Sequence, residues 1–505
     1  MAKQSPSTPR LNLMVFFVFV VAATTRVRCL DFIEQSLLTV PSLIFLSSLK
    51  TTLEEAKGAT SIVSKFVNEF EDLRVSSAIK DCVDLLDFTM DELSWTLSAT
   101  ESLTGKDNVT VQRSSDLKAW LSAALGNQDT CIEGFEGTNS VVKNVMAGKL
   151  QKLTSQVAKA LSMVRESPSS KKPSKGKFPA WMMKRDRRLL QAPASGVSAN
   201  VVVAADGSGS YTSVMDAILA APDYSSNRYV IYVKKGFYKE NVEIKKKKWN
   251  LMLVGDGMGV TVISGSRSVE GGYTTFRTAT FAVSGKGFIA RDITFENTAG
   301  PQKQQAVALR SDSDLSVFYN VDIRGYQDTL YTHSLRQFYR ECRITGTIDF
   351  IFGNGAVVFQ NCQIVPRKSS SNQWNTITAQ GRKDPNQSSG FSFQFCAIAA
   401  GSEGSNPTYL GRPWKQYSRT VFMQCSMSSV ISPEGWREWA GNFALSTLYY
   451  GEYMNTGPGA GLGGRVKWSG YHVLGTTEAS RYTVGQFING NQWLPQTGIK
   501  YTAGF

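Results

Sequence analysis

Six strand-like segments between residues 290 and 427 share a pattern of apolar and aromatic residues around one aspartate or cysteine. A repeat that never falls below about 20 residues but accepts insertions is typical of a solenoid, whose insertions become loops. We therefore expect residues 191–505 to form an all-β, right-handed parallel β-helix. A β-sandwich would not repeat one strand signature at this spacing. The aligned residues, separated by 30, 20, 20, 34 and 29 positions, are Asp292, Asp322, Cys342, Cys362, Cys396 and Cys425.

The cysteines of this region lead to a further expectation. Equivalent residues on adjacent coils lie about 4.8 Å apart, the strand spacing, and the Cα atoms of a disulfide usually lie roughly 4.4–6.8 Å apart. Cys342 and Cys362 are one coil apart, so we predict a disulfide between them. Cys396 and Cys425 either pair in the same way or stay free and buried in the stack.

The first 165 residues differ from the rest in composition and periodicity. Residues 1–29 place Lys3 and Arg10 before an apolar run of 13 residues, 11–23, which predicts a secretory signal peptide; a retained signal anchor is the alternative. Residues 30–165 contain little Gly or Pro and show helical periodicity, which predicts a helical bundle. In a secreted protein, Cys82 and Cys131 would join two of its helices.

Residues 166–190 form a basic linker rich in Ser and Pro. Because exposed linkers are where proteases cut, its dibasic end predicts a processing site, and an ordinary charged linker is the alternative. The residues of this predicted site are Arg187, Arg188, Leu189 and Leu190. Asn108 and Asn386 stand in Asn-x-Ser/Thr sequences and are candidate glycan acceptors.

The net charge of the chain limits the kinds of molecule that it is expected to bind. The formal net charge is +14, and the only histidines are His333 and His472. A basic surface suits a polyanion such as an acidic polysaccharide, although solubility alone explains it equally well. We find no nucleic-acid motif, and we interpret residues 245–248, four lysines, as a solvated turn. Two histidines are almost too few to build a His-based triad or a His-rich zinc site, and we expect no metal or cofactor.

Polar residues within apolar segments of 305–354 form the candidate catalytic centre. Asp328 and Asp349 are 21 positions apart (349 − 328), about one coil, so their carboxylates would stack and titrate as a pair. Such a pair provides one nucleophile or base and one general acid. Gln305 and Gln327 would offer N–H donors to an oxyanion, and Arg412 would orient Asp349. The alternative is a polar ladder that only stabilises the solenoid, the role we expect for Asp292 and Asp322.

At these residues the chain resembles plant pectin methylesterases (pectinesterases). Five segments carry the resemblance: Gly236-Phe-Tyr-Lys-Glu240, Gln305-Ala-Val-Ala-Leu-Arg310, Tyr326-Gln-Asp-Thr-Leu330, Asp349-Phe-Ile-Phe-Gly-Asn354 and Leu410-Gly-Arg-Pro-Trp414. The sequence around Cys82 and the segment 120–131 resemble the inhibitor-like, four-helix pro-domain of the long form of these enzymes. Residues 187–190 are similar to the processing signal of that family.

The resemblance implies roles for these residues. Asp349 would attack the C6 methyl ester of a galacturonosyl unit, and Asp328 would protonate the departing methanol and then activate water. The two glutamines would line the oxyanion hole, and Arg412 would hold Asp349. Gly236, Tyr238 and Glu240 are expected to be structural. The residues expected to contact substrate are Thr275, Gln305, Arg412 and Trp414, followed by Tyr331, Phe352 and Trp436 as further walls of the groove.

The resemblance also implies partners and a location. We expect a secreted, monomeric enzyme that acts on methyl-esterified pectin in the cell wall, is cut by a processing protease and is met by proteinaceous inhibitors. The chain departs from the family at Gln304, where histidine is common, and in having Cys29 as its only early cysteine. The Gln304 departure concerns the tuning of the site, and the missing early cysteine concerns the inhibitory or chaperoning role of the bundle.

Two other classes remain open. A pectin glycosidase would also use two carboxylates, whereas a lyase usually needs calcium held by an acidic cluster, which we do not find. A secreted binding or inhibitor protein, with residues 30–165 as the active module, would have no use for both aspartates and both glutamines.

Overall fold

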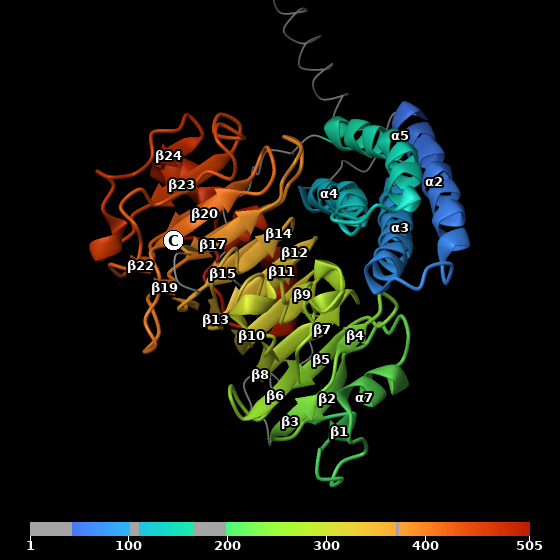
Figure 1. Cartoon of the computed structure of the whole chain (residues 1–505), viewed down its shortest axis with the longest axis horizontal. Helices are drawn as coiled ribbons and strands as arrows, with labels where there is room; N and C mark the ends of the chain where they lie inside the picture. The colour runs from blue at the N-terminus through green and yellow to red at the C-terminus, as the bar shows by residue number, and fades with distance from the viewer. Residues whose placement is uncertain (1–42, 102–110, 165–197, 370–372) are drawn as a thin grey trace, which may run out of the picture.

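The computed structural model describes residues 43–101, 111–164, 198–369 and 373–505 (Figure 1). The predicted signal peptide, Cys29, Asn108 and the linker with Arg187–Leu190 lie outside the described residues. Within the described part, no helix is both long enough and apolar enough to cross a membrane.

The described part of the N-terminal region contains four long helices, α2 (Leu43–Val63), α3 (Leu73–Glu101), α4 (Val111–Glu133) and α5 (Val141–Met163). Helix α5 illustrates why they form: Ser140 accepts a hydrogen bond from the Val142 amide as N-cap, and apolar residues at three- and four-residue steps line one buried face. The predicted disulfide between Cys82 and Cys131 is confirmed and joins α3 to α4.

The predicted parallel β-helix is also confirmed. One of its faces is a seven-stranded sheet in which every neighbouring pair is parallel. Each strand is short because the chain turns a corner at both ends. We call this face the groove sheet; its strands, in spatial order, are β4 (Val242–Ile244), β7 (Phe281–Val283), β9 (Leu309–Ser311), β11 (Leu330–Thr332), β14 (Ile351–Gly353), β17 (Asn375–Gln380) and β20 (Thr408–Pro413).

The other strands form the remaining faces, and the long strands β8 and β10 pair with neighbours on both. These strands are β1 (Val201–Val203), β2 (Tyr229–Val233), β3 (Gly236–Lys239), β5 (Leu251–Val254), β6 (Thr261–Gly265), β8 (Ile289–Asn297), β10 (Ser316–Arg324), β12 (Arg336–Arg340), β13 (Arg343–Gly346), β15 (Ala356–Gln360), β16 (Gln363–Pro366), β18 (Gly390–Gln394), β19 (Ala397–Ile398), β21 (Arg419–Met423), β22 (Ser426–Met427), β23 (Tyr449–Tyr453) and β24 (Tyr471–Val473).

Short helices close the coil. Glu240, expected to be structural, accepts hydrogen bonds from the Val214 and Met215 amides at the start of α7. Near the C-terminus, α9 and α10 pack on an outer apolar face of the β-helix. The short helices are α7 (Val214–Ala220), α8 (Thr476–Ser480), α9 (Val484–Phe487) and α10 (Gly490–Trp493), with 3-10 turns η1 (Ser64–Phe66), η3 (Thr275–Thr278), η4 (Pro301–Lys303), η5 (Pro458–Ala460) and η6 (Leu494–Thr497).

A left-handed corner explains the repeating sequence pattern and corrects its alignment. The residue before each signature cysteine has φ between 53° and 57°, and Asp292 and Asn320 occupy the same corner. Val321 pairs with Ile293, and Asp322 pairs with Arg343, the residue after Cys342. The equivalents of Cys342 are therefore Val321 and Ile293, so the predicted positions Asp322 and Asp292 are each wrong by one residue, in opposite directions.

The predicted disulfide between Cys342 and Cys362 is wrong, because both thiols are free and buried, as are those of Cys396 and Cys425. In a parallel stack, equivalent side chains point the same way, so their Cβ atoms stay about one strand spacing apart. A disulfide needs Cβ atoms roughly 3.5–4.5 Å apart. Each thiol instead lies beside a backbone carbonyl of the preceding coil, as Cys342 Sγ does at 3.2 Å from Phe318 O.

Aromatic rings extend this internal stack along the axis. Tyr339 stacks on Phe318 with ring centroids 4.6 Å apart, and Phe393 stacks on Phe359 at 4.5 Å and on Phe422 at 4.4 Å. Each such pair contributes about 0.5–1.5 kcal/mol beyond the burial of its area. The stack therefore holds the coils in register.

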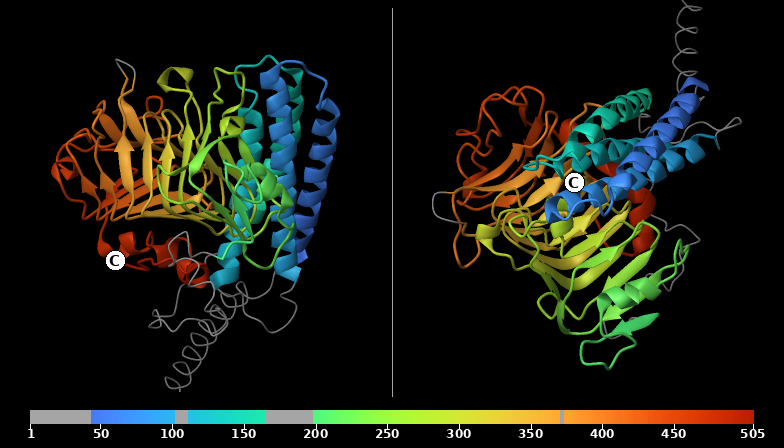
Figure 2. Two further views of the ribbon diagram at one scale, coloured as in Figure 1. Left: turned by 90° about the horizontal axis from the view of Figure 1, so that it is seen from below. Right: turned by 45° about the vertical axis from the view of Figure 1, so that its right-hand side comes forward.

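The helical bundle lies against the groove sheet through α3 and α4 (Figures 1 and 2). The expectation of a solvated turn at residues 245–248 is wrong for two of its lysines, of which Lys246 faces the bundle and Lys248 faces the C-terminal end of α7. Lys246 is 7% exposed, and its ammonium donates to Phe88 O at 2.9 Å. Lys248 is also buried and donates to Leu219 O. Carbonyl partners supply the hydrogen bonds that buried ammonium groups require.

Candidate active site

Asp349 lies two residues before β14 and is held by a guanidinium from two strands away. The Arg412 Nε atom donates to Asp349 Oδ1 at 2.9 Å, and an Arg412 Nη atom donates to Oδ2 at 2.6 Å. Strand β17 lies between them in the sheet, so the arginine side chain reaches back across one strand. Two parallel bonds of this kind fix both the charge and the plane of a carboxylate.

Two further residues support this pair, and neither was predicted from the sequence. Thr376 on β17 donates its hydroxyl to Asp349 Oδ1 at 2.6 Å and accepts from the Asp349 amide at 2.9 Å. The ring of Trp439 lies 4.2 Å from the Arg412 guanidinium carbon. An isolated threonine within a strand gives no sequence signal, whereas Trp439 is the second indole of a Trp-Arg-Glu-Trp segment.

Asp328 occupies the equivalent position on the next coil. Leu330 pairs with Ile351, and each aspartate stands two residues before its strand in a left-handed conformation. The Asp328 amide also donates to Ile348 O at 3.1 Å, which brings the two corners together. Burial, followed by the charge of Asp349, raises the pKa of Asp328 well above its ordinary value. The structure therefore brings the two carboxylates together and favours a proton on Asp328.

The two glutamines flank this pair and are both half-buried. Gln327 immediately precedes Asp328, and the Gln327 carbonyl accepts from the Ala306 amide, next to Gln305. The Gln305 Oε1 atom is buried without a hydrogen-bond partner among the described residues. A buried amide without a partner is costly unless another group or water bonds it. Gln304 is exposed and donates to Glu270 at 2.5 Å.

Three of the residues expected at the groove form its aromatic floor. Tyr331 and Phe352 stack with centroids 4.2 Å apart, and Trp414 meets Phe352 edge-on at 5.9 Å. Thr275 lies on η3 beside Phe276, whose ring packs edge-on against Tyr331. Flat apolar surfaces of this kind suit the faces of sugar rings, with polar groups at the rim to fix orientation.

The placement of Trp436 in the groove wall is wrong. Its side chain is 1% exposed, stacks on Tyr450 with centroids 4.1 Å apart and donates its indole N–H to Glu452. Its backbone pairs with Gly411, the neighbour of Arg412, so it supports the active-site strand from inside the coil. The indole that reaches the rim is that of Trp439, three residues later.

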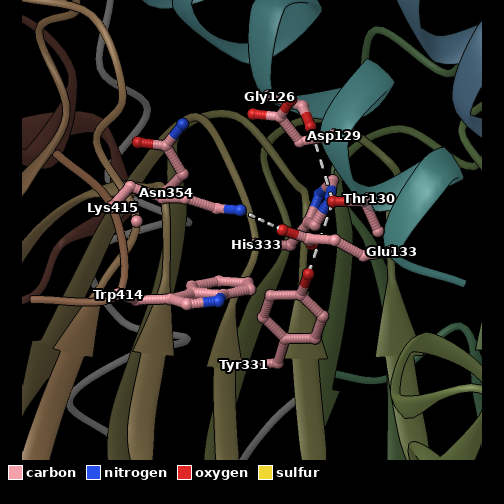
Figure 3. A pocket seen from close by; sticks show the side chains of 10 residues that line it. Gly126, Asp129, Thr130, Glu133, Tyr331, His333, Asn354, Trp414 and Lys415 are labelled. Carbon is pink, nitrogen blue, oxygen red and sulfur yellow. Dashed lines mark hydrogen bonds and ion pairs between the residues drawn. The ribbon is translucent and has the colours of Figure 1, made fainter. Parts of the chain in front are cut away.

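Helix α4 covers the aromatic floor (Figure 3). Glu133 forms an ion pair with Lys415, Asp129 accepts from Lys383 at 2.7 Å, and Thr130 lies 3.1 Å from His333 Nε2. A small cavity remains between the helix and the floor, lined by Gly126, Asp129, Thr130, Glu133, Tyr331, His333, Asn354, Gly381, Trp414 and Lys415.

Helix α3 covers the neighbouring coils. The Arg277 Nε atom donates to Asp81 at 2.6 Å, and the same guanidinium pairs with Asp84. Arg74 donates to Tyr273 O at 2.6 Å. With the bundle in this position, a polymer cannot lie on the aromatic floor.

Comparisons with known proteins agree with this arrangement, which defines a β-helix hydrolase with paired carboxylates. A family model described as pectinesterase matches residues 200–491, and a model described as plant invertase/pectin methylesterase inhibitor matches residues 27–164. A pectinesterase/pectinesterase inhibitor of Prunus persica is 61% identical over 482 residues, which cover 94% of this chain and 92% of that protein. Probable pectinesterase/pectinesterase inhibitor 32 of Arabidopsis thaliana is 56% identical over 520 residues, with 98% of each chain covered.

A solved structure of pectin methylesterase from carrot has a TM-score of 0.61 and 56% identity, and covers 61% of this chain and 99% of that chain. The chain described here therefore belongs to the pectinesterase family and carries an inhibitor-family region ahead of the enzyme. The matched share corresponds in length to residues 198–505, that is 308 of 505 residues. The solved carrot chain therefore has about the length of the β-helix region alone.

Replacing Asp328 with asparagine is expected to stabilise the fold at neutral pH. Because the folded-state pKa of Asp328 is raised, its contribution to stability is present below its ordinary pKa of 3.8 and is lost as pH rises through the folded value. Asparagine carries no such burial cost and tolerates the left-handed backbone. Thermal unfolding of the parent and of Asp328→Asn should give similar Tm values near pH 3.5 and a higher Tm for the variant at pH 8. A difference that narrows as pH rises would contradict a raised pKa.

Proposed function

We propose that this protein is a pectin methylesterase in which Asp349 is the nucleophile and Asp328 the general acid and base. The bidentate Arg412 contact and the raised pKa of Asp328 support this division, because a guanidinium orients Asp349 while burial favours a proton on Asp328. The substrate is methyl-esterified pectin, and no cofactor takes part.

In the first half of the reaction, an Asp349 oxygen attacks the C6 ester carbonyl of a galacturonosyl unit. The tetrahedral intermediate carries its negative charge on the former carbonyl oxygen, beside the side-chain amides of Gln305 and Gln327. As the C–O bond to the methoxy group breaks, Asp328 donates its proton, and methanol leaves. The product is an acyl-enzyme, an anhydride between Asp349 and the galacturonosyl carbonyl.

In the second half, Asp328 is a carboxylate and removes a proton from water. The resulting hydroxide attacks the galacturonosyl carbonyl, and the bond to Asp349 breaks. Asp349 returns as a carboxylate, Asp328 is protonated again, and the galacturonate acid loses its proton to solvent. Each cycle converts one ester and one water into methanol, a galacturonate and a proton, and the polymer keeps its length.

We also propose a role for each segment of the chain. Residues 1–29 direct secretion to the cell wall, residues 30–165 are a pro-domain that covers the groove, and a protease cuts the linker 166–190 at Arg187–Leu190. The contacts of α3 and α4 with the groove sheet support the covering role. The released region, 191–505, acts as a monomer on the wall polymer and is open to inhibitor proteins of the same family as the bundle. Glycans at Asn108 and Asn386 stay predictions.

Arg412→Gln tests the positioning of the nucleophile. Without the guanidinium, Asp349 loses both bonds that fix its plane, and misplacement by about 1 Å can cost on the order of 10²-fold in rate. Methanol release by residues 191–505 should therefore fall about 10²-fold. Arg340→Gln, on strand β12 outside the groove sheet, is the matched control and should keep the parent rate. An Arg412→Gln rate within twofold of the parent would contradict the proposed role.

A further inference from the structure

One lysine of the run at 245–248 is enclosed by helix α3. Lys246 is buried and stands two residues after the end of β4. Its ammonium donates to Phe88 O at 2.9 Å and to Glu92 Oε1 at 3.3 Å. It also lies 4.6 Å from the ring centroid of Phe88 and 4.9 Å from that of Trp95. A carboxylate, a carbonyl and two aromatic faces thus surround one ammonium group. We call Phe88, Glu92 and Trp95 the lysine cage.

The lysine cage is held in shape by contacts within the bundle. Its three residues follow one another at steps of four and three, so they share one face of α3. The second oxygen of Glu92, Oε2, accepts a hydrogen bond from Asn127 of α4 at 2.9 Å. Trp95 packs edge-on against Trp120, also of α4, with ring centroids 5.9 Å apart. The disulfide described above joins the same two helices. The bundle therefore presents a preformed site to the β-helix.

Glu92 needs a cation at this position. The residue is 1% exposed, and burial raises its pKa to about 7 even with Lys246 beside it. A buried carboxylate that loses its partner is strongly destabilising. A docked bundle that met no ammonium group here would bury such a charge. Arginine is a poor substitute, because its planar guanidinium needs more acceptors, in a different geometry, than a compact ammonium does.

The neighbouring lysines do not share this environment. Lys247 has a side chain that is 52% exposed and pairs with Asp223 of the β-helix region. Lys245 pairs with Glu243 at 2.8 Å, and an α3 carboxylate lies 3.7 Å away. Among the described residues, the hydrogen-bond and ion-pair partners of Lys246 all belong to α3. The contact therefore depends on the residue at position 246 rather than on the summed charge of the run.

We propose that the lysine cage determines which β-helix the bundle binds, by requiring a lysine two residues after the first strand of the groove sheet. In the uncut chain that lysine is Lys246. After the linker is cut, the released bundle binds the β-helix region of a second copy of this chain through the same contact. A β-helix with another residue at this position escapes it. The inference rests on the proposed covering role of the bundle. The anchor is remote from the catalytic aspartates, because β4 is three strands from β11 and four from β14.

The test measures binding of the bundle rather than methanol release. Each variant is made in the full chain, the linker is cut after folding, and the Kd of the two pieces is measured at pH 8, above the pKa of Glu92. We expect Lys246→Met to raise Kd on the order of 10²-fold, because it leaves Glu92 buried without its partner. Lys246→Arg should also bind more weakly than the parent. Lys247→Met is the matched control and should leave Kd unchanged.

A double variant distinguishes the lysine cage from a general loss of structure. Glu92→Gln removes the charge that Lys246 neutralises, so Lys246→Met/Glu92→Gln buries no unpaired carboxylate. It should bind about tenfold more tightly than Lys246→Met alone. Equal Kd values for the parent and Lys246→Met would overturn the inference. Equal weakening by Lys247→Met, or no recovery in the double variant, would overturn it too. Because binding is measured, a failure of the proposed ester hydrolysis would not change these results.

Discussion

Asp349→Asn is expected to abolish methanol release by residues 191–505 while leaving the β-helix folded. Asparagine cannot form the acyl-enzyme, and loss of a catalytic nucleophile lowers kcat on the order of 10⁴-fold or more. The backbone should not change, because Asn tolerates the left-handed φ of 50° at this corner. Methanol assay together with circular dichroism measures both effects.

Asp292→Asn is the matched control for that substitution. Asp292 has a φ of 56°, so the exchange is the same in chemistry and backbone conformation, but its side chain pairs with Arg291 and Asn320 away from the groove. The control should keep the parent rate. Substantial methanol release by folded Asp349→Asn would remove Asp349 from the role of nucleophile.

The intact chain is expected to release methanol far more slowly than residues 191–505. A linked bundle competes at an effective concentration of roughly millimolar, so even a micromolar intrinsic affinity for the groove would suppress activity on the order of 10²- to 10³-fold. The measurement is the initial rate on highly methylated pectin for the uncut chain and for residues 191–505. Equal rates would contradict an occluding bundle.

A pair of variants separates occlusion from other effects of the helical bundle. Asp81→Asn with Asp84→Asn removes the carboxylates that hold Arg277, so the bundle should bind less tightly and the uncut chain should gain activity. Glu54→Gln, on an exposed face of α2, is the control and should not change the rate. Failure of the interface variant to raise the rate of the uncut chain would count against these contacts as the cause of latency.

The proximity of Asp328 and Asp349 could be predicted from the sequence because coil length is a reliable measure of proximity in a solenoid. The 21-residue offset between Asp328 and Asp349 equals the strand register that pairs Leu330 with Ile351. The Arg412 contact was also predicted, although Arg412 lies 63 positions after Asp349. That prediction rested on the chemistry of a guanidinium beside a carboxylate and on the resemblance, not on coil spacing.

Side-chain direction at the corners could not be predicted in the same way. A left-handed residue reverses the alternation of a strand, so Asp322 and Val321 exchange places in the alignment. Trp436 points into the coil and Trp439 towards the rim, although both are indoles of one short segment. The free thiols of Cys342 and Cys362 follow from parallel side-chain directions, which the Cα spacing alone does not reveal.

The contact between the helical bundle and the β-helix could not be predicted from sequence patterns. The lysines at 245–248 form a run that is usually solvated, yet Lys246 is buried because α3 supplies both a carbonyl and Glu92. Thr376 gave no signal because its role depends on the adjacent coil. Such residues are defined by their partners, and those partners are far away in the sequence.

The most direct test of the esterase mechanism follows methanol and viscosity together, on one sample of highly methylated pectin treated with residues 191–505. We expect methanol to appear while viscosity stays constant, since only the ester bond is broken. A fall in viscosity without methanol would mean that the paired aspartates cleave the polymer backbone, and would contradict the esterase mechanism.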